Sequence, residues 1–238
     1  MHRFFALSLD DRHACLPPEE ENHALKVLRL RPGDACQALL DGRILSARIA
    51  ETAPRVLLIL EEELPSPEPQ TRVTLYQGVP KGDKMDYIVQ KCTEAGVFRV
   101  VPVHFSRCVA KWESRDAEKK QARLQRIAAE AAKQSGRAVV PRLSAPLTLN
   151  ALCRALPGHE AALVPWEEQR GCGIAAQWRG EGDVAIVIGP EGGISAEEMA
   201  LLTAAGGRPV SLGPRIFRTE TAGLAALISL LTLAGDMQ

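Results

Sequence analysis

The sequence lacks the short motifs that mark the commonest metal and nucleotide sites. Its six cysteines are widely scattered, and no Cys-x-x-Cys pair or histidine cluster has the spacing of a zinc site. The glycine-rich turn at residues 189–193 does not have the spacing of a dinucleotide-binding loop. Residues 78–85 approach a phosphate-binding loop but break its spacing and lack its final hydroxyl. A Gly-x-Ser-x-Gly nucleophile turn is also absent. We therefore expect no metal, and chemistry based on NAD, nucleoside triphosphates or a hydrolase serine is disfavoured.

Long apolar runs are also missing. The most apolar stretch, residues 222–234, is too short to span a bilayer and contains Gly223, Ser229 and Thr232. Residues 1–9 alternate as a strand does and show no signal peptide. We expect a cytoplasmic protein without a membrane segment, in which the cysteines are reduced.

The formal net charge is zero, but the charges are unevenly distributed. Residues 71–145 carry 15 basic and 7 acidic side chains, whereas residues 1–70 carry 8 and 12, and residues 146–238 carry 6 and 10. Aromatic residues make up only 4% of the chain. A basic segment without interleaved aromatics favours contact with a phosphate backbone over base stacking. The alternative is a charged, solvent-exposed helix.

The pattern of apolar residues changes after Pro65-Ser66-Pro67-Glu68-Pro69, which is typical of a stiff linker. We therefore predict two domains, residues 1–69 and 70–238. The first domain is β-rich and favours a small β-barrel. The second alternates strands and helices, which predicts an α/β domain with a largely parallel sheet. The expected strands are 3–9, 35–41, 44–51, 56–64, 73–79, 97–105, 161–164, 184–188 and 209–212, and the expected helices are 19–28, 83–95, 115–134, 149–156, 196–205 and 221–234.

Two polar turns follow predicted strands of the second domain. Residues 189–193 read Gly-Pro-Glu-Gly-Gly, and residues 212–222 contain two arginines, a glutamate and two threonines. Turns at the carboxyl ends of parallel strands form ligand crevices, and glycine permits close approach of the backbone. Two structural alternatives stay open: Glu191 begins a helix, and Arg218 and Glu220 only pair with each other.

Four sequence blocks together resemble one known family. They are Lys81-Gly82-Asp83-Lys84-Met85-Asp86 continuing to residue 97, residues 130–141 with Gln134-Ser135-Gly136-Arg137, residues 189–193, and residues 212–222. In this order they resemble the bacterial 16S ribosomal RNA (uracil-N3)-methyltransferase family, also called RsmE, within the SPOUT superfamily. Residues 23–34 likewise resemble the PUA-like RNA-binding domain of that family.

The resemblance implies a fold, a cofactor and partners. The fold would be a SPOUT-type α/β domain with a deep trefoil knot, preceded by a PUA-like β-barrel. The cofactor would be S-adenosylmethionine, and the protein would be a homodimer that forms 3-methyluridine in 16S rRNA of the 30S subunit. The implied cofactor-binding residues are Val164, Pro165, Gly189, Glu191, Gly192, Gly193, Leu212, Gly213, Ile216, Phe217, Thr221 and Ala222.

Methyl transfer to uracil N3 requires removal of the N3 proton and stabilisation of charge on the uracil oxygens. We expect Glu220 to be the general base and Arg218 to stabilise the charge. The expected RNA contacts are Arg3, His23, Arg29, Lys81, Lys84 and Arg107. Two alternatives stay open: a related methyltransferase that acts on another RNA such as tRNA, and a non-catalytic RNA-binding assembly factor.

Overall fold

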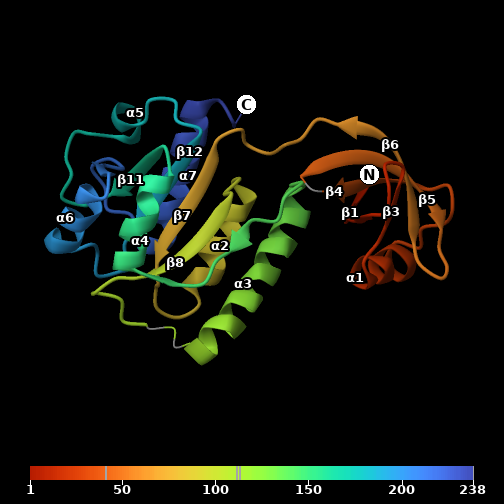
Figure 1. Cartoon of the computed structure of the whole chain (residues 1–238), viewed down its shortest axis with the longest axis horizontal. Coiled ribbons are helices and arrows are strands. Elements are labelled where there is room, and N and C mark those ends of the chain that lie inside the picture. Colours follow the sequence, from red (N-terminus) through yellow and green to blue (C-terminus); the bar gives the residue numbers. More distant parts are fainter. Residues whose placement is uncertain (41, 111, 113, 238) are drawn as a thin grey trace. The chain divides into compact units, whose positions relative to one another are not determined.

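The computed structural model describes residues 1–40, 42–110, 112 and 114–237 and forms two compact units. The first unit comprises Met1–Glu68 and Ala132–Val140, and the second comprises Pro69–Ala131 and Pro141–Gln238. No sequence pattern indicated that residues 132–140 belong with the first unit. The division at residue 69 into two continuous domains stays a prediction. Figure 1 shows the elements of both units.

The first unit is built on one mixed sheet of six strands, in the order β1-β4-β5-β6-β3-β2. The pair β1–β4 is parallel and the other pairs are antiparallel. Ala6 alone separates the two edge strands in sequence, so the sheet must curl to bring both edges to this residue. This curled sheet is what we observe, and the expected small β-barrel stays a prediction. The elements are β1 (His2–Phe5), β2 (Leu7–Ser8), β3 (His13–Cys15), α1 (Pro18–Asn22), the π-helical turn η1 (His23–Val27), β4 (Ala35–Leu40), β5 (Arg43–Glu51) and β6 (Leu57–Leu64).

An ion pair attaches residues 132–140 to the rest of the first unit. The Arg137 side chain is only 6% exposed, and its guanidinium donates to the Glu68 carboxylate. One oxygen of Glu68 also accepts the backbone N–H groups of Ala138 and Val139, at 2.8 and 3.1 Å. Charge-assisted bonds of this kind are the strong ones. The segment is therefore an integral part of this unit.

The second unit contains a parallel sheet, as the alternating pattern predicted. Its strand order is β10-β8-β7-β12-β11-β13, with β9 paired to β8, and the pairs are all parallel. The strands are β7 (Arg72–Gly78), β8 (Arg99–His104), β9 (Arg142–Leu143), β10 (Leu147–Thr148), β11 (Ala161–Pro165), β12 (Asp183–Ile188) and β13 (Gly207–Val210). The α/β class expected from the sequence is thus confirmed for this unit.

Helices cover both faces of the parallel sheet (Figure 1). Ala185 and Val187 of β12 pack in the cluster that includes residues of α4 and α6, while α7 packs on β7 and β12 beside α2. Both faces of β12 are buried, which explains the continuous apolar run of this strand. The helices are α2 (Lys84–Glu94), α3 (Ser114–Ser135), α4 (Leu149–Ala155), the 3₁₀ turn η2 (Leu156–Gly158), α5 (Ile174–Gln177), α6 (Ala196–Ala204) and α7 (Thr219–Ala234).

Candidate active site

A cavity of about 370 Å³ lies at the carboxyl ends of β11, β12 and β13. Its wall comes from the loop after each of these strands, the start of α7 and Lys84 of α2. The lining residues are Lys84, Pro165, Trp166, Glu167, Gln169, Arg170, Ile188, Gly189, Pro190, Glu191, Gly193, Ile194, Ser211, Leu212, Gly213, Pro214, Arg215, Ile216, Phe217, Arg218, Thr219, Glu220 and Ala222. The two polar turns recognised in the sequence therefore share one cavity.

Most residues expected to bind the cofactor line this cavity, but three do not. Val164 is fully buried in the core cluster beneath the sheet, and Gly192 lies against Arg107. The Thr221 hydroxyl donates to the carbonyl of Arg218 at 3.0 Å, inside the first turn of α7. The lining residues that were expected are Pro165, Gly189, Glu191, Gly193, Leu212, Gly213, Ile216, Phe217 and Ala222, together with Arg218 and Glu220.

Glycine serves packing within the turn at residues 189–193. A Cβ at Gly189 would lie 2.8 Å from the Ile194 side chain, and one at Gly192 would lie 2.9 Å from Cβ of Arg107. Gly213 is different, because its φ is +104° and a Cβ there would meet no atom within 4 Å. Close packing therefore accounts for Gly189 and Gly192, whereas a left-handed backbone favours glycine at residue 213 and at residue 193 of the first turn, where φ is +72°.

Thr219, the first residue of α7, joins the two turns. Its buried hydroxyl donates to the carbonyl of Gly189 at 2.7 Å and accepts from the Gln77 amide at 2.9 Å. These bonds fix the start of α7 against the end of β12. Glu220 and Arg218, on either side of Thr219, are thereby held at the cavity.

Lys84 carries the ion pairs at the cavity wall. Its Nζ lies 3.0 Å from Oε1 of Glu191 and 3.2 Å from Oε2 of Glu220. Lys81 adds a backbone N–H to the same oxygen of Glu191 at 3.0 Å. Glu191 does not begin a helix, because α6 begins after the Ser195 cap. Among the described residues, Glu220 pairs with Lys84 and not with Arg218, so neither structural alternative for these glutamates is observed.

Both glutamates are stabilised as carboxylates. The pKa of Glu220 is lowered, first by its own backbone N–H and then by Lys84 and Arg218, against the opposing effect of burial. Burial is the largest influence on Glu191, but hydrogen bonds from Lys84 and two backbone N–H groups outweigh it and lower the pKa. Position in the first turn of α7 also favours negative charge at Glu220. The Glu220 side chain is therefore ionised at neutral pH.

The family resemblance indicated the end of β11, through Val164 and Pro165, but not the residues of the loop that follows. That loop supplies Trp166, Glu167, Gln169 and Arg170 to the cavity. The indole N–H of Trp166 donates to the carbonyl of Ile194 at 3.3 Å, which joins this loop to the turn after β12. The available signal was the position of the loop, at the carboxyl end of a third parallel strand. Its composition resembles an ordinary polar surface loop.

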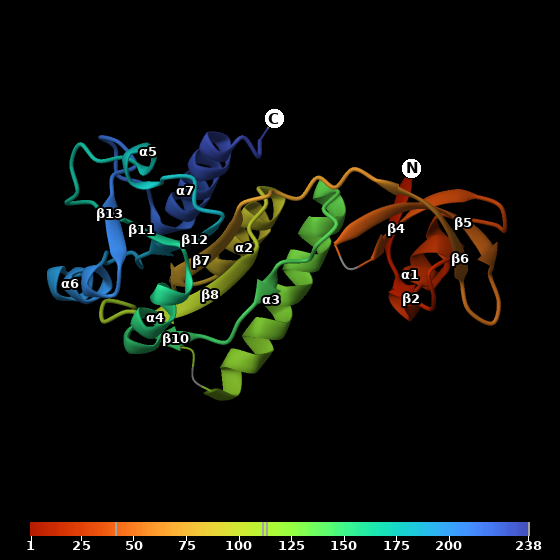
Figure 2. The same cartoon turned by 45° about the horizontal axis from the view of Figure 1, so that its top comes forward.

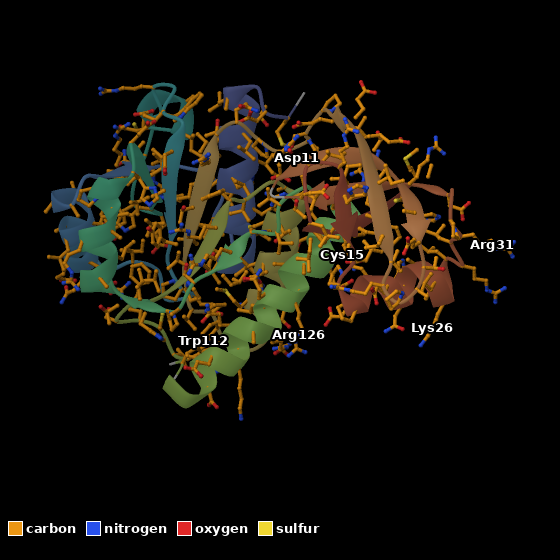
Figure 3. All side chains as sticks on the ribbon, turned by 45° about the vertical axis from the view of Figure 1, so that its right-hand side comes forward. Asp11, Cys15, Lys26, Arg31, Trp112 and Arg126 are labelled. Carbon is orange, nitrogen blue, oxygen red and sulfur yellow. The ribbon has the colours of Figure 1, made fainter. Side chains whose placement is uncertain are left out.

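The residues expected to contact RNA lie in both units. In the first unit, His23 and Arg29 are exposed near Lys26 and Arg31, whose side chains extend from the ribbon in Figure 3. The guanidinium of Arg3 donates to Gln37 and to the carbonyl of Gly136. In the second unit, Lys81 is exposed, and Arg107 is exposed and donates to the carbonyl of Gly192 at 3.0 Å.

Two further features concern metals and membranes. In the part of the chain that the structure describes, no group of three or more His, Cys, Asp or Glu is arranged to hold a metal ion. No helix within the described ranges has both the length and the apolar character needed to cross a bilayer.

A cavity at the carboxyl edge of a parallel sheet, with apolar walls and clustered charges, defines a ligand-binding α/β domain. The family model for an RNA methyltransferase domain matches residues 66–231, and the chain belongs to this family. The resemblance noted in the sequence is thereby confirmed.

Relatives and solved structures extend this match over the whole chain. Ribosomal RNA small subunit methyltransferase E of Bacillus subtilis is 34% identical over 221 residues, covering 88% of this chain and 86% of that protein. The protein of the same name from Mycobacterium bovis is 33% identical, covering 94% and 88%. A crystal structure of ribosomal RNA small subunit methyltransferase E from Neisseria gonorrhoeae, bound to S-adenosyl methionine, is 32% identical with a TM-score of 0.84 and covers 100% of both chains.

Proposed function

We propose that this protein transfers a methyl group from S-adenosylmethionine to N3 of a uridine in 16S rRNA. One observation carries the proposal: the Glu220 carboxylate and Arg218 lie in one cavity with two turns suited to a small ligand. The family match and the names of the relatives support the same activity. The small-subunit rRNA in those names points to the 30S subunit as the context and to the cytoplasm as the location.

The cavity residues fit S-adenosylmethionine. The volume of about 370 Å³ lies within the range of small-molecule pockets. Ile188, Leu212 and Phe217 offer apolar wall, and the open side of Gly213 leaves backbone accessible. Bound there, the cofactor would supply an electrophilic methyl group on a sulfonium.

Glu220 and Arg218 would act on the uracil. The Glu220 carboxylate would accept the N3 proton and leave the N3 lone pair free to bond the methyl carbon. The bond from that carbon to the sulfonium sulfur would break, leaving a neutral thioether. Arg218 faces the negative charge that then develops on the uracil oxygens, because a guanidinium presents several donors in a fixed plane. General-base catalysis of this kind contributes about 10²–10⁴-fold to the rate.

The substitution Glu220→Gln tests the assignment of the base. We expect kcat to fall by about 10²–10⁴-fold while the affinity for S-adenosylmethionine, measured by calorimetry, changes little. Thr203→Val on α6 is the control and should keep full activity, because the hydroxyl of this exposed residue bonds within its own helix and does not line the cavity. Unchanged kcat in Glu220→Gln would remove Glu220 as the base.

RNA recognition is proposed to involve both units. His23, Arg29 and Arg3 of the first unit, and Lys81 and Arg107 of the second, are the proposed contacts. If they contact phosphates, each loss should weaken RNA binding and flatten its salt dependence without changing the modified nucleotide.

A trefoil knot and a PUA-like barrel are part of the proposal. Support for the knot comes from the path of the chain after β13. The chain does not stay beside this edge strand, since α7 packs on β7, β12 and α2 (Figure 2). Knots are rare exceptions to the usual chain connections. Support for the barrel is the curl of the six-stranded sheet.

Incubation with labelled S-adenosylmethionine and three substrates tests the activity. The substrates are 30S subunits, naked 16S rRNA and bulk tRNA. We expect label in one or both of the 16S samples. Label in tRNA alone would instead favour the related methyltransferase, and a protein that neither binds the cofactor nor transfers label would favour a non-catalytic assembly factor.

A further inference from the structure

The position of Lys84 in the cavity differs from that of an exposed RNA contact. The residue begins α2, whereas Glu191 lies after β12 and Glu220 is the second residue of α7. Three segments that are far apart in the sequence thus meet at one ammonium group. All three side chains line the cavity.

These ion pairs are partly shielded from water. The side chains of Lys84, Glu191 and Glu220 are 33%, 29% and 18% exposed. Oε2 of Glu220 is buried and accepts no hydrogen bond of good geometry from the described residues. Among those residues, Lys84 is the cation within ion-pair distance of both carboxylates. Solvent and salt screen partly buried ion pairs less than surface pairs, so removal of such a pair changes the free energy of the site more.

We infer that Lys84 is a positioning residue, which fixes the Glu220 carboxylate in the cavity and couples it to the Glu191 turn. The inference rests on the proposed function, in which Glu220 accepts the N3 proton. Lys84 itself need not touch the uracil. An ammonium with three donors can hold two carboxylates at once, and it leaves the second oxygen of each available to other groups.

Charge at the cavity supports this role. Removal of the ammonium would leave two neighbouring carboxylates without their shared counter-charge, and the pKa of at least one would rise. The other charged residues that line the cavity are Glu167, Arg170, Arg215 and Arg218. Arg218 is the last of the influences that lower the pKa of Glu220, after Lys84. The remaining cations therefore replace Lys84 only in part.

Kinetic measurements on Lys84→Met and Lys84→Arg test the inference. In Lys84→Met we expect kcat to fall by about 10- to 100-fold, more than the change in RNA or cofactor affinity, because misplacement of a catalytic group costs rates of this order. Lys84→Arg should recover part of the loss. Lys91→Met is the matched control, because Lys91 lies on the same helix and pairs with Glu94 away from the cavity. If Lys84→Met weakens RNA affinity and flattens its dependence on salt concentration but leaves kcat unchanged, the inference is overturned and Lys84 is identified as an RNA contact.

A second measurement does not depend on turnover. Carbon-13 NMR of the glutamate carboxyl carbons, in protein without cofactor, reports the pKa of Glu220. We expect this pKa to be higher in Lys84→Met than in the wild type, and the acid limb of the kcat profile to move to higher pH with it. If Lys84→Met does not fold, Lys84→Gln replaces it.

The outcomes separate the inference from the proposed function. A wild type that transfers no methyl group would refute the proposed function, and the NMR titration would still decide whether Lys84 controls Glu220. An unchanged pKa of Glu220 together with unchanged kcat in Lys84→Met would refute the inference alone.

Discussion

Arg29 has a backbone conformation that lowers the stability of the fold, and it is also a proposed RNA contact. Among the described residues other than glycine, it alone has a positive φ, at 56°. This conformation costs an L-residue about 1–2 kcal/mol, and strain of this kind is often retained at functional sites.

We predict that Arg29→Gly raises the free energy of unfolding by up to about 1 kcal/mol and weakens RNA binding. Chemical denaturation and a filter-binding titration measure the two effects. Arg31→Gly is the control, because φ is not positive there, and it should not raise the free energy of unfolding. An Arg29→Gly variant with neither a higher free energy of unfolding nor a lower RNA affinity would contradict the prediction.

At this scale the sequence located residues of the cavity, but it did not predict their contacts. Arg218 and Glu220 were recognised because they are dense polar residues at a turn. Their pairing with each other was the natural alternative, because they are neighbours in sequence. The observed partner of Glu220 is Lys84, which is far away in the chain. Only the packing of α2 against α7 brings the two together, and no local pattern reports it.

The start of α7 is the element on which the site depends. Thr219 joins this helix to Gly189 and Gln77 through two buried hydrogen bonds.

We predict that Thr219→Val destabilises the protein by about 1–3 kcal/mol, because a buried carbonyl and a buried amide lose their partner. The affinity for S-adenosylmethionine should fall as well, since the two turns are no longer joined. Thermal unfolding and calorimetry check both. Thr203→Val serves as control, because that residue is exposed and its hydroxyl bonds within α6. Equal effects of the two variants would refute the role of Thr219.

Elements with strong patterns were predicted well. The apolar strand β12, the Ser195 cap and the long helix α3 all match the sequence prediction within one or two residues. The short elements β3, β10 and α5 were missed, because two to four residues carry no periodicity, and the predicted strand 3–9 is divided into β1 and β2. Helix α7 begins at Thr219 and not at Thr221, since Arg218 adopts the extended backbone of a cap without a capping side chain. Of the predicted strand 35–41, Asp41 lies outside the described residues.

At the scale of the whole molecule, α7 supports the proposed homodimer. Its exposed face carries Ile228, Ser229, Thr232 and Leu233 and no charged residue, which is unusual for a helix face in water. We predict that light scattering gives twice the chain mass of 25.8 kDa. Ile228→Glu should shift the mass toward the monomer, because a charge on this face opposes burial. A wild-type mass equal to one chain would contradict the dimer.

The α/β class followed from alternation of strands and helices, because parallel strands require crossover connections. Assignment of residues 132–140 to the first unit did not follow from the sequence. It depends on Glu68, whose carboxylate gathers Arg137 and two backbone N–H groups. Such a buried pair leaves no local signal, since both residues are of types that are usually exposed.

Identification of the methylated nucleoside tests the central claim most directly. After incubation of 30S subunits or 16S rRNA with this protein and S-adenosylmethionine, the RNA is digested to nucleosides and analysed by mass spectrometry. We predict 3-methyluridine, at one nucleotide per 16S rRNA molecule, and its loss with Glu220→Gln. A methyl group on a ribose oxygen or at carbon 5 of uracil, neither of which requires the N3 proton to leave, would contradict the account.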